Sequence, residues 1–209
     1  DVNSDSFVYD NVLVQQGFVP SGSIHSDIST VGSNSVINQY VNLTTKQHDH
    51  LSGSVIVSPD TGRVKVAERY AKRLDCEVAA IYKRRSLQVA NEVEALGVMG
   101  DVDGRTCVII DDMIDTAGTI CAAVDTLFEN GATDVLCATT HAVFSGPAVE
   151  RLKDSRLSKV IVTNSVPLPD SKQFEKLEVL SVAGVLADAL EAVFEDASVS
   201  EIFDGDNHS

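Results

Sequence analysis

The segment at residues 108–119, VIIDDMIDTAGT, places acidic and small hydroxyl-bearing residues in an order that suits a particular ligand. Asp111 and Asp112 follow an apolar run, Asp115 comes next, and residues 116–119 lead into a predicted helix. Backbone N–H groups at a helix N-terminus bind anions, and small residues let a ligand approach the backbone closely. Paired carboxylates suit sugar hydroxyls, or a divalent cation shared with phosphates. A phosphorylated sugar would satisfy both halves of the segment.

Two simpler interpretations explain less of this segment. Capping of the helix by Asp115 or Thr116 would account for one residue, but not for the two acids before it. A nucleotide-binding P-loop would require the pattern GxxxxGK[ST], which occurs nowhere in the chain.

Two further polar segments follow predicted strands. Residues 83–85, KRR, form one of the few basic clusters in an acidic chain, with a solvated salt-bridge patch as the alternative. Asp60, in PDTG, is a candidate metal ligand or simply a turn residue. His141 could act as an acid–base group, but we expect it to make a structural hydrogen bond.

Strands and helices alternate from residue 55 onward, which predicts βαβ units in an α/β fold with a mainly parallel sheet flanked by helices. In such sheets ligands bind beyond the carboxyl ends of the strands. The polar segment 83–93 is interpreted as a loop. Apolar runs predict strands at 55–58, 76–82, 106–110, 134–140, 159–164 and 177–182, and periodicity predicts helices at 63–74, 118–131, 146–155 and 183–196.

Composition narrows the possible partners. The 209 residues carry a formal net charge of −15, which argues against nonspecific nucleic-acid binding. No apolar run approaches the ~18 residues of a membrane span, so we expect no membrane partner. Residue 1 is Asp and no signal segment opens the chain, so we expect a processed chain or a fragment. The four cysteines form no CxxC pair, and we expect reduced, buried thiols in a cytoplasmic protein, with a disulfide pair as the alternative.

Residues 1–54 differ from the rest and form a separate unassigned region. They are rich in Ser, Asn, Gln, Val and Thr, and Lys46 is their only Lys or Arg. We expect a few strands or a partly ordered extension there. KQHDHLSG has two histidines flanking an acid, which suggests either a metal ligand pair or, as we expect, a solvated loop.

The segment DDMIDTAGT resembles the phosphoribosyl-binding loop of the type I phosphoribosyltransferase fold. The rest of the sequence makes the resemblance more specific. Five further segments occur in order: VIVSPDTGRVKVAERYA, YKRRS, VANEV, ATTHAVFSGPAVERLKDS and SVSEIFDGD. Together these segments, over residues 55–206, resemble the C-terminal half of the ribose-phosphate pyrophosphokinase (PRPP synthetase) family, in an actinobacterial form.

The resemblance implies a role for each candidate residue. Asp111 and Asp112 would hold the ribose hydroxyls. Lys83 and Arg85 would lie on a mobile catalytic loop and stabilise the transferring diphosphoryl group, as a transition state that gathers negative charge requires. Asp60 would bind Mg²⁺. The 5-phosphate of ribose 5-phosphate would be held by Asp115, Thr116, Ala117, Gly118 and Thr119.

The implied activity is diphosphate transfer from ATP to ribose 5-phosphate, giving AMP and PRPP for nucleotide biosynthesis, in a homo-oligomer that is hexameric in the family. The N-terminal domain of that family carries much of the ATP site. Its phenylalanine-acid-glycine-glutamate, RQDRR-like and Asp-Leu-His segments have no counterpart here beyond an echo in DHL. The histidine that supplies the second metal ligand in the family is therefore not identified.

Three hypotheses follow. The chain could be a PRPP synthetase or its C-terminal portion. It could be a non-catalytic or regulatory subunit that keeps the sugar-phosphate loop and assembles with a full-length synthetase. It could also be a phosphoribosyltransferase that consumes PRPP, although the double acid and the KRR segment resemble synthetase features.

Overall fold

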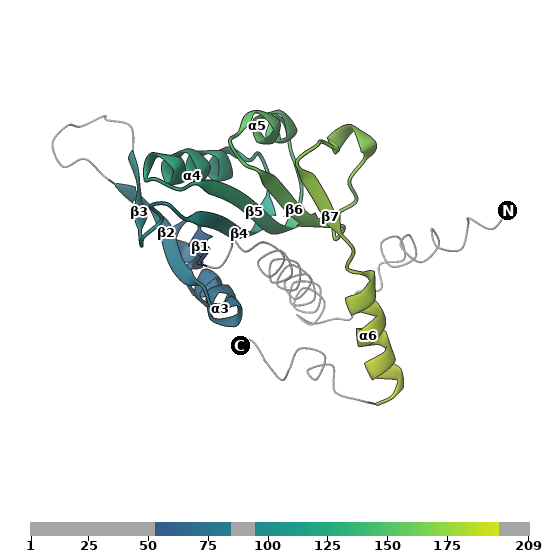
Figure 1. The fold of residues 1–209 in the computed structure, drawn as a ribbon. Helices are drawn as coiled ribbons and strands as arrows, with labels where there is room; N and C mark the ends of the chain where they lie inside the picture. The colour runs from purple at the N-terminus through teal and green to yellow at the C-terminus, as the bar shows by residue number, and fades with distance from the viewer. Residues whose placement is uncertain (1–52, 85–94, 197–209) are drawn as a thin grey trace.

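A computed structural model describes residues 53–84 and 95–196. These residues form a seven-stranded sheet with the strand order β3-β2-β1-β4-β5-β6-β7 (Figure 1). Neighbouring strands are parallel except β2 and β3, which pair antiparallel at the edge. The α/β fold with a mainly parallel sheet, expected from the alternation of strands and helices, is confirmed.

The elements follow one another as predicted from residue 55, with one additional strand. In chain order they are β1 Val55–Ser58, the 3₁₀ helix η2 Thr61–Arg63, α3 Val64–Leu74, β2 Glu77–Arg84, β3 Ala95–Met99, β4 Thr106–Ile114, α4 Gly118–Glu129, β5 Asp134–Ala142, α5 Ala148–Asp154, β6 Lys159–Thr163, the 3₁₀ helix η3 Asp170–Lys172, β7 Leu177–Leu180 and α6 Ala183–Phe194.

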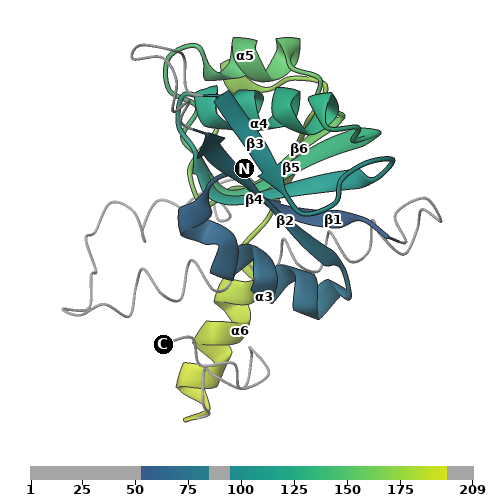
Figure 2. The same ribbon diagram turned by 90° about the vertical axis from the view of Figure 1, so that its left-hand side faces the viewer.

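Helices cover the two faces of the sheet unequally. Helices α4 and α5 pack on one face and α3 on the other, while α6 extends beyond the β7 edge (Figures 1 and 2). Alternation along the strands separates two cores: Val57 and Ile109 face α4, whereas Ile56 and Val108 face α3. The buried inner stretches of the central strands β1, β4 and β5, residues 55–57, 107–110 and 135–138, are apolar because both faces of the sheet are covered there.

Two strand predictions were wrong at their ends. β4 does not end at Ile110 but continues to Ile114, since β5 runs beside it and pairs Met113 with His141. β2 continues through Lys83 and Arg84, which the sequence had placed in a loop, because β3 pairs with it. β3 itself was not predicted.

The unequal lengths of two neighbouring strands make a step in the sheet. β1 has four residues and its last pair with β4 joins Val57 to Ile109, whereas β4 and β5 stay paired as far as Ile114 and Ala142. The chain leaves β1 at Ser58 and turns into η2. The acidic end of β4 therefore has a strand on one side and the turn into η2 on the other.

Among residues 53–84 and 95–196, no helix combines the length and the apolar character that a membrane crossing requires.

Candidate functional site

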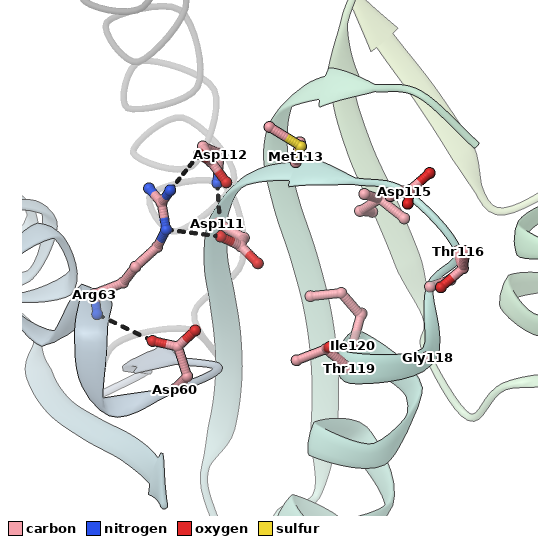
Figure 3. A pocket seen from close by; sticks show the side chains of 12 residues that line it. Asp60, Arg63, Asp111, Asp112, Met113, Asp115, Thr116, Gly118, Thr119 and Ile120 are labelled. Atoms are coloured by element: carbon pink, nitrogen blue, oxygen red, sulfur yellow. Dashed lines mark hydrogen bonds and ion pairs between the residues drawn. The ribbon is translucent and has the colours of Figure 1, made fainter. Parts of the chain in front are cut away.

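The end of β4, the loop after it and the start of α4 line a pocket of about 330 Å³ at the carboxyl edge of the sheet. Asp60 and Arg63, from the segment after β1, complete it (Figure 3). The structure thus brings together eight candidates separated by up to 59 positions: Asp60, Asp111, Asp112, Asp115, Thr116, Ala117, Gly118 and Thr119.

Arg63 bridges the two neighbouring carboxylates. Its Nε lies 3.3 Å from Asp111 Oδ1, and its Nη2 donates to Asp112 Oδ2. The backbone N–H of Asp112 also donates to Asp111 Oδ1, at 2.9 Å. Sequence reasoning assigned Arg63 only to a helix, and no local pattern ties it to acids 48 and 49 positions later. It is a site residue that the sequence analysis missed.

The protonation of Asp111 is set mainly by burial. Burial raises the pKa of Asp111 to about 6, and the neighbouring Asp112 adds to this, while the backbone N–H of Asp112 and the Arg63 guanidinium lower it. The side chain of Asp111 is 15% exposed, compared with 29% for Asp112. The two acids, adjacent in sequence, therefore differ in environment.

The loop after β4 is held by buried residues at every third position. Ile114, Ala117 and Ile120 are buried, while the residues between them are exposed to the pocket side. Ala117 has φ 61° and stands at the N-cap position of α4, where no side chain caps the helix. Capping of the helix by Asp115 or Thr116 is thus not what the structure shows.

In this loop the backbone carbonyls accept hydrogen bonds, whereas the backbone N–H groups are left open. The carbonyl oxygens of residues 114–117 accept, in order, from Phe144 N (3.0 Å), Ser145 N (2.8 Å), Arg151 Nη1 (3.0 Å) and Cys121 N (3.0 Å). Within the described part of the chain, no acceptor takes the backbone N–H groups of residues 116–119. A loop whose carbonyls are bonded and whose N–H groups stay open at a helix N-terminus is suited to an anion.

Asp60 has a structural role that the sequence suggested as an alternative. Its Oδ1 accepts from the N–H of Gly62 at 2.7 Å and of Arg63 at 3.1 Å, which caps η2. In Figure 3 its other oxygen lies away from these N–H groups. No three acidic, histidine or cysteine side chains that could hold a metal ion converge in the described ranges.

A second cavity, of about 770 Å³, adjoins the first and shares Asp60, Gly118 and Thr119 with it. Lys83 and Tyr82 line this second cavity from β2, and Leu96 does so from β3. Lys83 therefore lies near the site, but on a strand rather than on the expected loop. Arg85 lies outside the described residues.

Arg151 is a second residue that the sequence analysis missed. It lies on α5 and donates from Nη1 to the carbonyl of Thr116. It also lies close to the start of α4, since a Cβ added at Gly118 would come within 3.5 Å of its Nη1. Arg151 thus joins the second helix of this face to the loop.

Two other expectations have clear outcomes. His141 Nδ1 is 2.9 Å from Ser165 Oγ, which agrees with the structural hydrogen bond we expected. All four cysteines are free thiols, but only Cys107 and Cys137 are buried, while Cys76 and Cys121 are half-buried. Burial raises the pKa of each of the four thiols, which disfavours the reactive thiolate.

The sheet and the strand–loop–helix pocket at its carboxyl edge define a protein of the type I phosphoribosyltransferase-like α/β class. The crystal structure of phosphoribosylpyrophosphate synthetase from Mycobacterium smegmatis superposes with a TM-score of 0.68 and 44% identity, over 77% of this chain and 51% of that one. The model of the phosphoribosyl synthetase-associated domain matches residues 85–204. The chain belongs to this phosphoribosyl synthetase family.

Curated relatives match the same part of the chain. The ribose-phosphate pyrophosphokinase of Streptomyces avermitilis is 52% identical over 149 residues, covering 71% of this chain and 46% of the relative. That of Mycobacterium tuberculosis is 52% identical over 153 residues, covering 73% and 47%. The chain thus spans about half the length of these relatives, as the resemblance to one half of the family implied.

Proposed function

We propose that this chain is the sugar-phosphate half of a ribose-phosphate diphosphokinase, which transfers diphosphate from ATP to ribose 5-phosphate. The observation that carries the proposal is the loop at 114–119, with bonded carbonyls and open N–H groups next to a carboxylate pair. The N–H groups and the hydroxyls of Thr116 and Thr119 would hold the 5-phosphate. Asp111 and Asp112 would accept from the ribose hydroxyls, and Asp115, Ala117 and Gly118 would complete the phosphate loop.

The second cavity would take the transferring group. In the reaction, the anomeric oxygen of ribose 5-phosphate attacks the β-phosphorus of ATP, the bond to the α-phosphate oxygen breaks, and AMP leaves while the hydroxyl proton is released. Lys83 lines this cavity and would stabilise the negative charge that gathers on the diphosphoryl group, together with Arg85. Transfer also requires ATP to be positioned beside the sugar, a proximity effect worth up to ~7–11 kcal/mol of barrier.

A magnesium ion fits this arrangement as a cofactor shared with the substrates. Asp60 lies between the two cavities and would supply one carboxylate oxygen, while substrate phosphates and waters would supply the others. Bound there, Mg²⁺ would neutralise part of the charge on the transferring phosphates. A homo-oligomer in the cytoplasm, without nucleic-acid or membrane partners, completes the proposal and is consistent with four free thiols and a net charge of −15.

The same pocket would also serve a second candidate function, that of a non-catalytic or regulatory subunit, which binds the sugar phosphate and assembles with a complete synthetase.

Calorimetry of the 209-residue chain with ribose 5-phosphate, followed by ATP and Mg²⁺, tests the proposal. We expect binding of ribose 5-phosphate and much weaker binding of ribose. Thr119→Val should weaken binding about tenfold by removing one donor to a charged phosphate, whereas Thr133→Val, the same change on an exposed residue before β5, should not. AMP formation would identify a working enzyme, and sugar-phosphate binding without AMP a binding subunit. Absence of ribose 5-phosphate binding would reject both.

A further inference from the structure

Arg63 and the acid pair form a contact whose geometry leaves room for a ligand. Arg63 engages one oxygen of each carboxylate, Asp111 Oδ1 and Asp112 Oδ2. In the described part of the chain, no residue donates a hydrogen bond to Asp111 Oδ2 or Asp112 Oδ1. Each acid thus keeps one acceptor oxygen, and in Figure 3 that of Asp111 points away from Arg63.

A vicinal diol has two donors, as many as the acceptor oxygens that remain on the two acids. Its two neighbouring hydroxyls can each donate to one carboxylate oxygen, and hydrogen bonds to charged acceptors are stronger than neutral ones. Arg63 can stay in place while this happens, because it occupies different oxygens. The planar guanidinium of an arginine, with several N–H donors, also fixes the orientation of both carboxylates. The ammonium group of a lysine would do this less well.

The backbone position of Arg63 is fixed as well. Its backbone N–H donates to Asp60 Oδ1 in the cap of η2, so the main chain from which the guanidinium extends toward β4 is held in place. The side chain is 35% exposed and brings one positive charge to two adjacent acids. Without it, the two carboxylates would be held close together with no cation from residues 53–84 or 95–196 in contact with them.

We propose that Arg63 is a positioning residue that orients Asp111 and Asp112 to recognise the vicinal diol of the sugar phosphate, and so makes the site selective for ribose over 2-deoxyribose. This inference rests on the proposed function, since it assumes that ribose 5-phosphate is the ligand of the pocket.

The test compares the affinities of the full chain for ribose 5-phosphate and 2-deoxyribose 5-phosphate by calorimetry. The wild-type chain should prefer ribose 5-phosphate about tenfold, the discrimination expected from one hydrogen bond to a charged group. Arg63→Gln should bring the ratio of the two affinities to within about twofold of one, while affinity for 2-deoxyribose 5-phosphate stays unchanged. Arg63→Lys should restore part of the ratio, because it keeps the charge without the fork.

Arg69→Gln is the matched control, since it removes the same charge from an exposed position on α3 and should leave the ratio intact. A general loss of structure would lower both affinities together, whereas the proposal requires a change in their ratio. An unchanged ratio in Arg63→Gln overturns the inference but not the proposed function. Tighter ribose 5-phosphate binding in Arg63→Gln would also overturn it, because Arg63 would then be a competitor for the acids. Failure of the wild-type chain to bind either sugar phosphate would remove the proposed function and the inference together.

Discussion

Arg151 Nη1 lies 3.0 Å from the carbonyl oxygen of Thr116, so the side chain of one helix holds the backbone of the loop that starts another. Of the four loop carbonyls at residues 114–117, this is the one that accepts from no backbone N–H of the described residues. It keeps the peptide unit after Thr116 oriented with its N–H toward the pocket side, because the carbonyl and the N–H of one peptide unit point in opposite directions.

Arg151→Ala should therefore weaken ribose 5-phosphate binding about threefold to tenfold, or about 0.7–1.4 kcal/mol, by loosening the loop. Calorimetry of the full chain measures it. Lys153→Ala, an equal loss of charge at an exposed position on the same helix, is the control and should bind as the wild type does. Equal affinity in the wild type and Arg151→Ala would show that the loop holds its shape without this tether.

Substitutions of Asp60 can distinguish its role as the cap of η2 from its proposed role as a metal ligand. Asparagine caps helices about as well as aspartate but carries no charge. The free energy of unfolding of Asp60→Asn should therefore lie within about 0.5 kcal/mol of the wild-type value. It should nevertheless weaken Mg²⁺-dependent binding of pyrophosphate, a probe for the diphosphoryl group, by about tenfold, since Mg²⁺ prefers charged oxygen ligands. Ribose 5-phosphate binding should not change.

Asp60→Ala completes this comparison. It should lose about 1 kcal/mol of unfolding free energy with the cap, in addition to the pyrophosphate affinity. If Asp60→Asn binds Mg²⁺ and pyrophosphate like the wild type, Asp60 is a turn and capping residue only.

Ala117 adopts φ 61°, a left-handed conformation that costs a residue with a Cβ about 1–2 kcal/mol. Its methyl group is buried, which offsets about 0.8 kcal/mol, and glycine would lose more entropy on folding. The free energy of unfolding of Ala117→Gly should therefore lie within about 1 kcal/mol of the wild-type value. Ala117→Val should be less stable by more than about 2 kcal/mol, because a branched side chain adds strain and overpacking. Urea unfolding measures both, and a stable Ala117→Val would contradict the left-handed assignment.

How far the sequence predicted this site depends on the range of the interactions. The acids, the loop at residues 114–117 and α4 lie within one continuous segment, so local spacing was enough to place them together. The end of β4 was set too early, at Ile110, because two acids resemble the end of a strand. What keeps Asp111 in the strand is its pairing with Thr139 on β5, which no local pattern encodes.

Longer-range features were missed for the same reason. β3 is five residues long, contains Gly97 and has no clear period, and it is defined by its pairing with β2. Arg63 and Arg151 reach the site from other elements, 48 and 35 positions from their partners Asp111 and Thr116. An arginine near the start or in the middle of a predicted helix gives no local sign that its side chain crosses to another element.

Asp111 should make stability depend on pH in an identifiable direction. Its pKa rises from an ordinary 3.8 to about 6 on folding, so the folded chain binds the proton more tightly. The stabilisation from this group is fully present below about pH 3.8 and is lost as the pH rises through about 6. The unfolding free energy of the wild type relative to Asp111→Asn should thus increase on going from pH 7.5 to pH 5.

Denaturant unfolding at several pH values measures this difference, in which the carboxylates remote from Asp111 cancel. Asp125→Asn, an exposed position on α4, should show no such trend. A difference between the wild type and Asp111→Asn that decreases on acidification would mean that Arg63, rather than burial, dominates the protonation of Asp111.

Gly100 and Gly104 allow the cost of a steric clash to be compared with the cost of backbone strain alone. Both have positive φ, 108° and 69°, but a Cβ at Gly100 would lie 2.8 Å from the carbonyl oxygen of Val78 and 2.9 Å from Ala79 Cβ. At Gly104 nothing lies within 4 Å. Gly104→Ala should cost about 1 kcal/mol through strain alone, and Gly100→Ala about 2–4 kcal/mol, since the β2 backbone must also move. Equal midpoints in urea would contradict the close approach of Gly100 to β2.

The step between the short β1 and the long β4 has a consequence for how this fold can diversify. Both neighbouring strands hold β4 as far as Ile109. Residues 110–114 are held by β5, and the β1 ladder does not reach them. Within this stretch Ile110 and Ile114 are core residues, whereas residues 111–113 are not buried. Substitutions at 111–113 can change which molecule is recognised while the inner ladder keeps its register, so the sheet separates the residues that preserve the fold from those that can acquire a new specificity.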